Sequence, residues 1–267
     1  MHPLISAAEL SRRLHDVGLY DMRWDLVDPG KGRQTYADGH IPGAVFVDLD
    51  HDLASEPGLD GRHPLPPILD FASTLGRLGI EPGMHVVVYD DSGGRMAARL
   101  WWMLRSIGHE DVQVLDGGFP AWVAEGGKVE TGVVTPRRGT YPAPDGFTGV
   151  VTHDQLGDRV IVDARAGERY RGEIEPVDPK AGHIPGAVNI PTGHNLGESD
   201  RFHDAVRLAE VYREVPDDVV VSCGSGVTAC HAALAVVASG RPMPDVYVGS
   251  FSEWSRRDLP VTLGPNP

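Results

Sequence analysis

The sequence contains Gly39-His40-Ile41-Pro42-Gly43-Ala44-Val45 and repeats it 143 residues later as Gly182-His183-Ile184-Pro185-Gly186-Ala187-Val188. Three further pairs of segments follow the same order in the two halves: residues 21–23 with 163–165, 86–90 with 219–223, and 117–122 with 249–254. Self-similarity at a nearly constant spacing is the signature of a duplicated structural unit. We therefore expect two copies of one domain in this chain of 267 residues.

The two halves share one pattern of predicted strands and helices. Apolar runs at 86–89 and 219–222 do not alternate with polar residues, which is typical of strands buried on both faces. Further strands are predicted at 44–47, 160–163 and 187–190, and helices at 71–78, at 206–213 and after Ser6 and Thr152. Strands that alternate with helices indicate an α/β fold, a mostly parallel sheet flanked by helices, in each domain.

The stretch between the two halves is rich in Gly, Pro and Thr and has no helical periodicity. Such a composition is typical of a connecting segment. We expect a first domain at 1–126, a linker at 127–149 and a second domain at 150–267.

The charge and the cysteine content exclude several classes of protein. Lys and Arg number 24 and Asp and Glu 38, so the net charge is −14, which disfavours binding to nucleic acid or to an anionic membrane. No apolar run is long enough to span a bilayer, and the first residues lack the pattern of a signal peptide. With only two cysteines there is no disulfide framework, and no Cys/His cluster has zinc spacing. We expect a cytoplasmic, monomeric protein with no metal.

Cys223 follows the apolar run at 219–222 and precedes the turn Gly224-Ser225-Gly226. A helix is predicted to begin near Gly226 or Val227, so Cys223 lies at the carboxyl end of a central strand, where open α/β sheets bind ligands. Glycines leave backbone N–H groups exposed, and these groups together with the helix N-terminus stabilise a thiolate. The position of Cys223 therefore predicts a nucleophile.

The alternative is that Cys223 is a small buried apolar residue, as many free cysteines are. The turn of Gly224, Ser225 and Gly226 has no packing reason under that alternative, so we favour the nucleophile. For Cys230 we favour core packing, because it lies among alanines inside the predicted helix.

Cysteine phosphatases use the same kind of loop with different chemistry. They need an arginine six positions after the cysteine, whose planar guanidinium grips the phosphoryl oxygens. Ala229 occupies that position, so phosphatase activity is disfavoured.

The loop 223–228 resembles the active-site loop of 3-mercaptopyruvate sulfurtransferases, and residues 36–47 and 249–254 are similar to rhodanese family signatures. The resemblance covers nearly the whole chain and implies two tandem rhodanese-like domains. It implies an enzyme without a cofactor: Cys223 takes the sulfane sulfur of a small donor, 3-mercaptopyruvate or thiosulfate, as a persulfide and passes it to a thiol or cyanide.

The resemblance also assigns roles to individual residues. Arg169 is expected to bind the anionic group of the donor, and the loop residues Gly224, Gly226, Val227 and Thr228 to contact it. Ser225, His63 and Asp50 match a proposed serine-protease-like triad that would handle protons. Asp90 stands where the first copy would carry the cysteine, so only the second domain is expected to be catalytic.

One feature departs from the family pattern. Many mercaptopyruvate enzymes carry a second substrate arginine shortly after Glu-x-Glu-Pro, but here Glu175-Pro176 is followed by Val177-Asp178-Pro179-Lys180. Lys180 would offer a point charge in place of a planar fork, and Arg171 is expected to be structural or exposed. The loop favours mercaptopyruvate and the missing arginine weakens that preference, so both donors stay open. A persulfide carrier or sensor acting with a partner protein is the alternative function.

Overall fold

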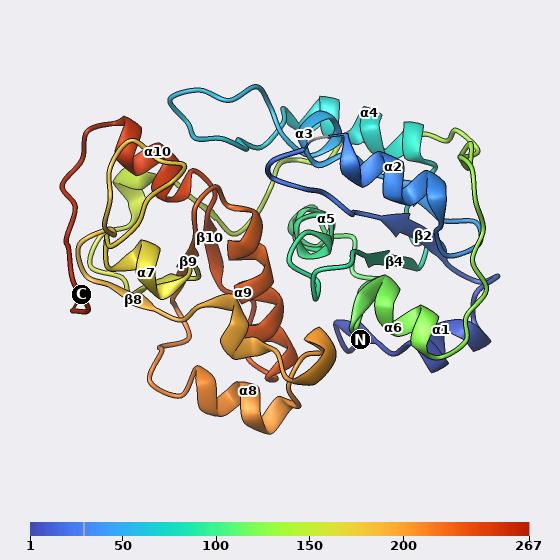
Figure 1. The fold of residues 1–267 in the computed structure, drawn as a ribbon. Coiled ribbons are helices and arrows are strands. Elements are labelled where there is room, and N and C mark those ends of the chain that lie inside the picture. The colour runs from blue at the N-terminus through green and yellow to red at the C-terminus, as the bar shows by residue number, and fades with distance from the viewer. Residues whose placement is uncertain (29, 267) are drawn as a thin grey trace. The chain divides into compact units, whose positions relative to one another are not determined.

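The computed structural model describes residues 1–28 and 30–266, which form two compact units (Figure 1). Unit 1 comprises Met1–Ala54, Pro66–Thr148 and Glu198–Phe202. Unit 2 comprises Ser55–Leu65, Gly149–Gly197 and His203–Pro267. The segment Ser55–Leu65 therefore belongs to the unit that contains Cys223, although it lies in the first half of the sequence.

Unit 1 is built on a five-stranded parallel sheet in the order β1-β5-β4-β2-β3. Its strands are β1 (Leu4–Ile5), β2 (Gly18–Asp21), β3 (Val45–Phe46), β4 (Val86–Tyr89) and β5 (Val112–Leu115). Its helices are α1 (Ala7–Arg12), α2 (Lys31–Asp38), α3 (Leu49–Asp52), α4 (Ile68–Leu78), α5 (Ala97–Ser106) and α6 (Gly118–Ala124), with the 3-10 turn η3 (Glu198–Asp200). In Figure 1, α2 and α4 lie above strands β2 and β4, and α1 and α6 lie below them.

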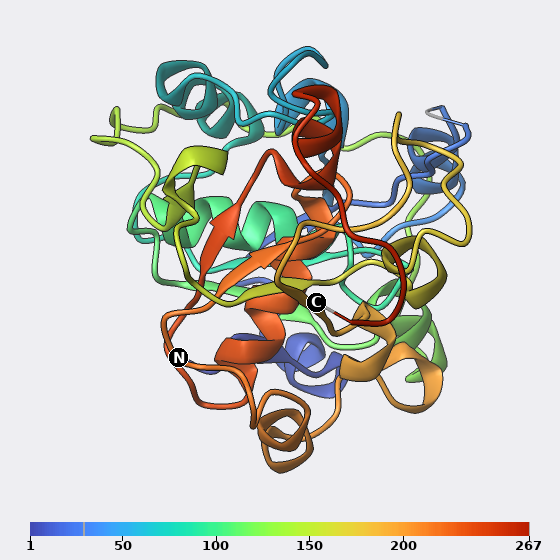
Figure 2. The same cartoon turned by 90° about the vertical axis from the view of Figure 1, so that its left-hand side faces the viewer.

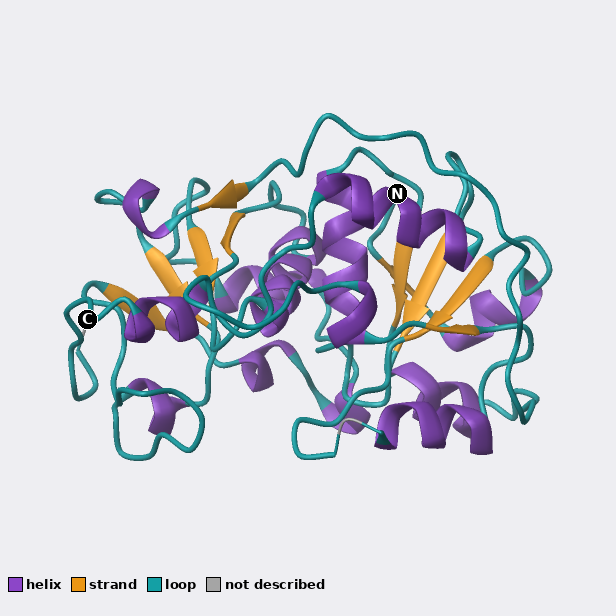
Figure 3. Cartoon of the chain, turned by 90° about the horizontal axis from the view of Figure 1, so that it is seen from above, coloured by secondary structure: helices purple, strands orange, loops and turns teal. Residues whose placement is uncertain are grey.

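Unit 2 has a second five-stranded parallel sheet, in the order β6-β10-β9-β7-β8. Its strands are β6 (Val150–Val151), β7 (Ile161–Asp163), β8 (Ala187–Asn189), β9 (Val220–Ser222) and β10 (Asp245–Tyr247). Its helices are α7 (Gly167–Tyr170), α8 (Ala205–Val211), α9 (Val227–Ala238) and α10 (Ser250–Arg256), with the 3-10 turns η1 (His153–Gln155) and η2 (Thr192–Asn195). Figure 3 shows the strands of each sheet side by side with helices packed against them.

The two sheets have the same strand order, so that β1, β2, β3, β4 and β5 correspond by position to β6, β7, β8, β9 and β10. This arrangement confirms the α/β duplication expected from the sequence. The predicted strand at 86–89 has the same bounds as β4, and other strands and helices differ by one to three residues at their ends. The helix predicted after Thr152 is instead the short 3-10 turn η1. Such differences arise because element ends fray and are fixed by local hydrogen bonds.

The central strands are buried on both faces, as their unbroken apolar runs predict. All four residues of β4 and all three of β9 are buried. Full burial of one valine side chain contributes roughly 1.5–3 kcal/mol, so these strands form the hydrophobic centre of each unit.

Helix α9 packs against β9 and β10 in unit 2 (Figure 2). It is apolar on nearly all sides, and its buried residues include Cys230, whose Sγ donates to the Gly226 carbonyl at 3.2 Å. Its N-terminus is capped by Gly226, so the helix begins directly after the cysteine loop. None of the helices in the described ranges combines the length and the apolar character needed to cross a membrane.

Each unit holds a buried ion pair at the carboxyl end of an equivalent strand. The Arg23 guanidinium donates to both carboxylate oxygens of Asp21 and, through Nη2, to the Gly39 carbonyl at 2.6 Å. Arg165 makes the same contacts with Asp163 and with the Gly182 carbonyl. Each arginine thereby fastens the strand end to the Gly-His-Ile-Pro-Gly segment, which explains why both segments are repeated.

The histidine of each repeated segment is a packing residue. His40 stacks on Tyr36 with ring centroids 4.2 Å apart, and His183 stacks on Tyr170 at 3.8 Å. Both histidines are fully buried. The repeated motif therefore supports the fold of each unit.

Residues 127–148 run along unit 1 without helix or strand. Backbone hydrogen bonds join Gly132 N to the Ala37 carbonyl at 2.8 Å and Gly139 N to the Gly76 carbonyl at 2.9 Å. The segment assigned to a linker from its composition is thus attached to the first unit by several contacts.

We predict that Arg23→Met lowers the free energy of unfolding by about 3–5 kcal/mol, because it leaves the Asp21 carboxylate buried and unpaired. Arg33→Met is the control, since Arg33 is largely exposed and meets Asp48 only at 3.5 Å; it should cost at most about 1 kcal/mol. Urea unfolding followed by tryptophan fluorescence measures both values. Equal losses in the two variants would contradict a structural role for the buried pair.

Candidate active site

Cys223 follows β9 directly and lies at the N-terminus of α9, as the sequence predicts. The side chain is buried, and its Sγ accepts a hydrogen bond from Gly226 N at 3.2 Å. A backbone N–H that points at sulfur from the first turn of a helix stabilises negative charge on that sulfur. The geometry is suited to holding a thiolate.

The two glycines of the loop serve different purposes. Gly226 has φ +81°, and a Cβ atom there would lie 2.2 Å from the Val248 carbonyl oxygen, so only glycine fits. A Cβ atom at Gly224 would meet side-chain ends instead, Nη2 of Arg62 at 2.9 Å and Nη1 of Arg169 at 3.4 Å. Gly224 therefore leaves an open backbone face toward two guanidinium groups.

The start of α10 holds the cysteine loop in place. Ser250, which has φ +52°, accepts a hydrogen bond from Cys223 N at 3.1 Å and donates to the Tyr247 carbonyl at 2.8 Å. Phe251 N and Ser252 N donate to the carbonyls of Cys223 and Gly224 at 3.0 and 2.8 Å. The sequence identified 249–254 only as a repeated signature, and its hydrogen bonds to the loop were not anticipated.

The segment Ser55–Leu65 brings His63 to Ser225. His63 Nδ1 and Ser225 Oγ are 2.8 Å apart, and both residues are largely buried. Asp60 and Arg62 anchor the segment to α10, through a 2.5 Å ion pair with Arg257 and a 3.1 Å hydrogen bond from Arg62 N to Ser252 Oγ. Two members of the expected triad thus meet in unit 2.

Asp50, the third expected member, lies on α3 in unit 1. Its Oδ2 accepts a hydrogen bond from Trp24 Nε1 at 2.8 Å. A role for Asp50 beside His63 stays a prediction.

Arg169 lies in a network of ion pairs. Its Nη2 donates to Glu175 at 2.7 Å and to Asp178 at 3.1 Å, while Arg62 Nη1 also pairs with Asp178. Burial acts to raise the pKa of Glu175, but hydrogen bonds from Arg169 and from backbone N–H groups outweigh it and hold that pKa below its ordinary value. The positive charge expected of Arg169 is therefore balanced by neighbouring carboxylates, and Arg169 serves as a directional donor.

Arg62 was not among the residues singled out from the sequence. Burial lowers the pKa of its guanidinium, and the charge of Asp178 acts in the opposite direction. Burial also raises the pKa of Asp178, against the influence of the two arginines. The sequence feature that could have indicated Arg62 is its position next to His63, a member of the expected triad.

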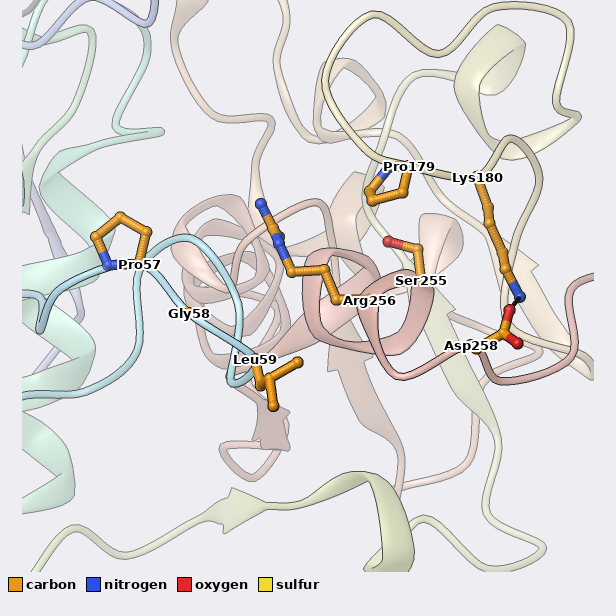
Figure 4. A pocket seen from close by; sticks show the side chains of 8 residues that line it. All are labelled: Pro57, Gly58, Leu59, Pro179, Lys180, Ser255, Arg256 and Asp258. Atoms are coloured by element: carbon orange, nitrogen blue, oxygen red, sulfur yellow. Dashed lines mark ion pairs between the residues drawn. The ribbon is translucent and has the colours of Figure 1, made fainter.

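Lys180 and Arg171 are engaged elsewhere in unit 2. Lys180 Nζ meets Asp258 at 2.6 Å and the Leu259 carbonyl at 3.1 Å, beside a pocket of about 500 Å³ (Figure 4). Arg171 is partly exposed and pairs with Glu173 at 2.7 Å. The lysine is held by these contacts and does not take the place of the arginine missing after Pro176.

Val227 and Thr228, which the resemblance assigns to donor binding, form the first turn of α9. Val227 is buried and Thr228 is partly exposed. Within residues 1–28 and 30–266, no group of three or more His, Cys, Asp or Glu side chains is arranged to hold a metal ion.

The equivalent loop of unit 1 is filled by its own side chain. The buried Asp90 carboxylate accepts hydrogen bonds from four backbone N–H groups, those of Ser92, Gly94, Met96 and Ala97, at 2.7–3.0 Å. An anion that is fixed by four donors occupies the place that a bound anion would need. The first loop is thus closed to external anions.

A family model of the rhodanese-like domain matches the chain twice, over residues 6–125 and 151–257. A probable 3-mercaptopyruvate sulfurtransferase of Pseudomonas aeruginosa is 41% identical over 94% of this chain and 94% of its own length. A putative thiosulfate sulfurtransferase of Mycobacterium tuberculosis is also 41% identical, over 94% of this chain and 93% of its own. The solved structure of 3-mercaptopyruvate sulfurtransferase from Leishmania major matches with a TM-score of 0.86 and 31% identity, over 94% of this chain and 74% of that one. These matches confirm the resemblance inferred from the sequence.

We predict that substitution by alanine mainly lowers stability at Gly226 and mainly weakens donor binding at Gly224. Gly226→Ala should lower the free energy of unfolding by more than about 2 kcal/mol, because its Cβ would overlap the Val248 carbonyl at a positive φ. Gly224→Ala should cost less than about 1 kcal/mol, because flexible arginine ends can move away, yet it should weaken binding of an anionic donor. Chemical unfolding and the KM for the donor measure the two effects. A Gly224→Ala variant with unchanged KM would show that this face of the loop takes no part in binding.

Proposed function

The chain belongs to the rhodanese-like family and is a sulfurtransferase, and on that basis we propose that Cys223 is the nucleophile that carries the transferred sulfur as a persulfide. The observation that carries this proposal is the position of the thiol at the N-terminus of α9, with Gly226 N directed at Sγ. A thiolate in such a site is both stabilised and nucleophilic.

The proposed reaction has two steps. The Cys223 thiolate attacks the thiol sulfur of mercaptopyruvate or the outer sulfur of thiosulfate and forms an S–S bond. The donor's C–S or S–S bond to that sulfur breaks, and its electron pair leaves with pyruvate enolate or sulfite. A thiolate or cyanide then attacks the outer sulfur of the persulfide and releases the Cys223 thiolate. Since the leaving enolate or sulfite takes the electron pair, the transfer balances by itself, and we propose that no metal or organic cofactor takes part.

The pair of Ser225 and His63 supports a role in proton transfer. When mercaptopyruvate is the donor, its thiol proton must be removed and the enolate must gain a proton, whereas sulfite leaves thiosulfate as a stable anion. A hydroxyl hydrogen-bonded to imidazole can relay a proton in this way. We propose that Ser225 and His63 perform this step, with Asp50 as a further member.

Both small donors remain candidates. The loop residues Gly224 and Ser225 carry no basic side chain, which favours 3-mercaptopyruvate, but the two relatives at 41% identity are named for different donors. We propose transfer from mercaptopyruvate or thiosulfate to a thiol or cyanide by a monomer. Two free, buried cysteines fit a reducing compartment such as the cytoplasm.

We propose that catalysis is confined to the second domain. In the first, four backbone N–H groups of the loop already donate to the Asp90 carboxylate, and no thiol is present to carry a persulfide. The division into a first domain at 1–126, a connecting segment at 127–149 and a catalytic domain at 150–267 is part of this proposal. The first domain then has a structural and substrate-shaping role, because its segment Ser55–Leu65 brings His63 to Ser225.

We predict that Cys223→Ser abolishes sulfur transfer to cyanide from both donors, because a hydroxyl cannot form the persulfide. Cys230→Ser should retain most of the activity, since Cys230 is a buried residue inside α9. Steady-state rates with 3-mercaptopyruvate and thiosulfate, measured side by side, give kcat/KM for each donor. Similar losses in both variants would refute the assignment. Turnover of neither donor by the wild type would favour a persulfide carrier that acts with a partner protein.

Ser225→Ala should lower kcat with 3-mercaptopyruvate by about 100-fold or more and change kcat with thiosulfate by less than about 3-fold. The difference follows because only the enolate leaving group needs a proton. His63→Gln should show the same preference between donors. Equal losses with both donors would mean that the Ser225–His63 pair only shapes the loop.

A further inference from the structure

The residues that precede and follow Arg62 in the sequence make contacts that hold it beside the cysteine loop. Before it, Asp60 pairs with Arg257, and Gly61 approaches α10 so closely that a Cβ atom would lie 2.8 Å from Ser252 Oγ. After it, His63 meets Ser225. Because the residues on both sides are held, the backbone of Arg62 is fixed next to the cysteine loop.

The two ends of the Arg62 guanidinium face different groups. Nη1 pairs with Asp178, whose side chain is fully buried. Nη2 is directed at the open face of Gly224, where Nη1 of Arg169 also lies. Neither of these two loop-facing nitrogens has a hydrogen-bond partner among residues 1–28 and 30–266. Unused donors of two guanidinium groups thus converge next to Cys223.

We propose that Arg62 is a substrate-binding residue, which together with Arg169 grips the anionic oxygens of the sulfur donor over Gly224. Guanidinium groups bind carboxylate and sulfonate-like oxygens through short, charge-assisted hydrogen bonds. The shared chemistry is an anionic oxygen group close to the sulfur that is transferred, supplied either by the carboxylate of mercaptopyruvate or by the oxygens of thiosulfate. This inference rests on the proposed function of Cys223.

The site attracts an anion through directed donors and not through net charge. Arg62 and Arg169 are matched by Glu175 and Asp178, so these four groups are neutral together. Asp178 and Glu175 hold the inner ends of the two guanidinium groups, which turns the outer nitrogens toward the loop. A protein with a net charge of −14 can therefore bind a small anion here without a basic surface.

The same contacts explain how the site can lack the arginine that many mercaptopyruvate enzymes carry shortly after Glu-x-Glu-Pro. Val177, which follows Glu175-Pro176, offers only its backbone N, and that N–H donates to Glu175 at 3.0 Å. The second guanidinium comes instead from Ser55–Leu65, a segment more than a hundred residues earlier in the sequence. Arg62 thus supplies the planar guanidinium group that is missing after Pro176.

The first test compares Arg62→Gln with the wild type in steady-state transfer to cyanide. Loss of a charge-assisted hydrogen bond should raise KM for both donors by about 10- to 100-fold, with less than about a 3-fold change in kcat. Arg171→Gln is the matched control, because Arg171 is paired with Glu173 at the surface of the same unit and should leave KM unchanged. A rise for only one donor would identify the anion that Arg62 contacts. An unchanged KM for both donors would overturn the proposal.

A second variant separates donor binding from the pairing with Asp178. The double variant Arg62→Gln/Asp178→Asn removes both charges and leaves neutral groups of similar size that can hydrogen-bond. If Arg62 binds the donor, KM stays raised in the double variant. If Arg62 only neutralises Asp178, the double variant recovers the wild-type KM, and the proposal fails.

Alkylation of Cys223 provides a readout that needs no turnover. Iodoacetate carries a carboxylate and iodoacetamide does not, so the ratio of their rates at Cys223, followed by peptide mass spectrometry, reports binding of the anionic group. Arg62→Gln should lower this ratio by about 5-fold or more, and Arg171→Gln should leave it unchanged. A ratio unaffected by Arg62→Gln would contradict the proposal. A wild type that turns over neither donor would refute the proposed function, while the alkylation ratio would still decide the role of Arg62.

Discussion

Arg165 and Asp163 form a buried, bidentate ion pair at the carboxyl end of β7, and the other charged groups of the site are linked to it. Arg165 Nη1 lies 3.5 Å from Glu175, Glu175 binds Arg169, and Arg169 shares Asp178 with Arg62. Arg165 also stacks on Phe251 at 3.9 Å, at the start of the helix whose N–H groups hold the cysteine loop. Removing one partner of such a buried pair leaves an unpaired charge, so the network is sensitive to each of its members.

The first unit has the same buried pair, in Arg23 and Asp21, but it uses its loop differently. Asp90 satisfies four backbone N–H groups with its own carboxylate, and the loop is complete without a ligand. In the second unit, Cys223 Sγ accepts a hydrogen bond from Gly226 N, so an N–H group of the loop is directed at the sulfur. The equivalent position of the duplicated fold thus holds a carboxylate with four donors in one unit and a thiol in the other.

The site of unit 2 is assembled from five stretches of chain: Ser55–Leu65, the 165–178 region, the cysteine loop, α9 and α10. Hydrogen bonds join two of these stretches to the loop, from His63 to Ser225 and from Cys223 N to Ser250. Gly224 and Gly226 allow these approaches, one by leaving room for guanidinium groups and one by adopting a positive φ. Catalytic geometry of this kind depends on supporting contacts as much as on the reacting group.

The sequence by itself determined the duplication, the α/β class, the strand that ends before Cys223 and the contrast between Cys223 and Asp90, because these follow from local patterns of apolar residues and from repeated motifs. It also singled out Arg169 as a candidate for donor binding, but it did not show the carboxylates of Glu175 and Asp178 that balance its charge. Only the tertiary structure decided that Ser55–Leu65 belongs to the unit of Cys223, that Arg62 faces Gly224, and that Lys180 is engaged with Asp258. The physical reason is that hydrogen bonds and ion pairs between distant segments leave no periodic trace in the sequence, so their partners become visible only when the chain is folded.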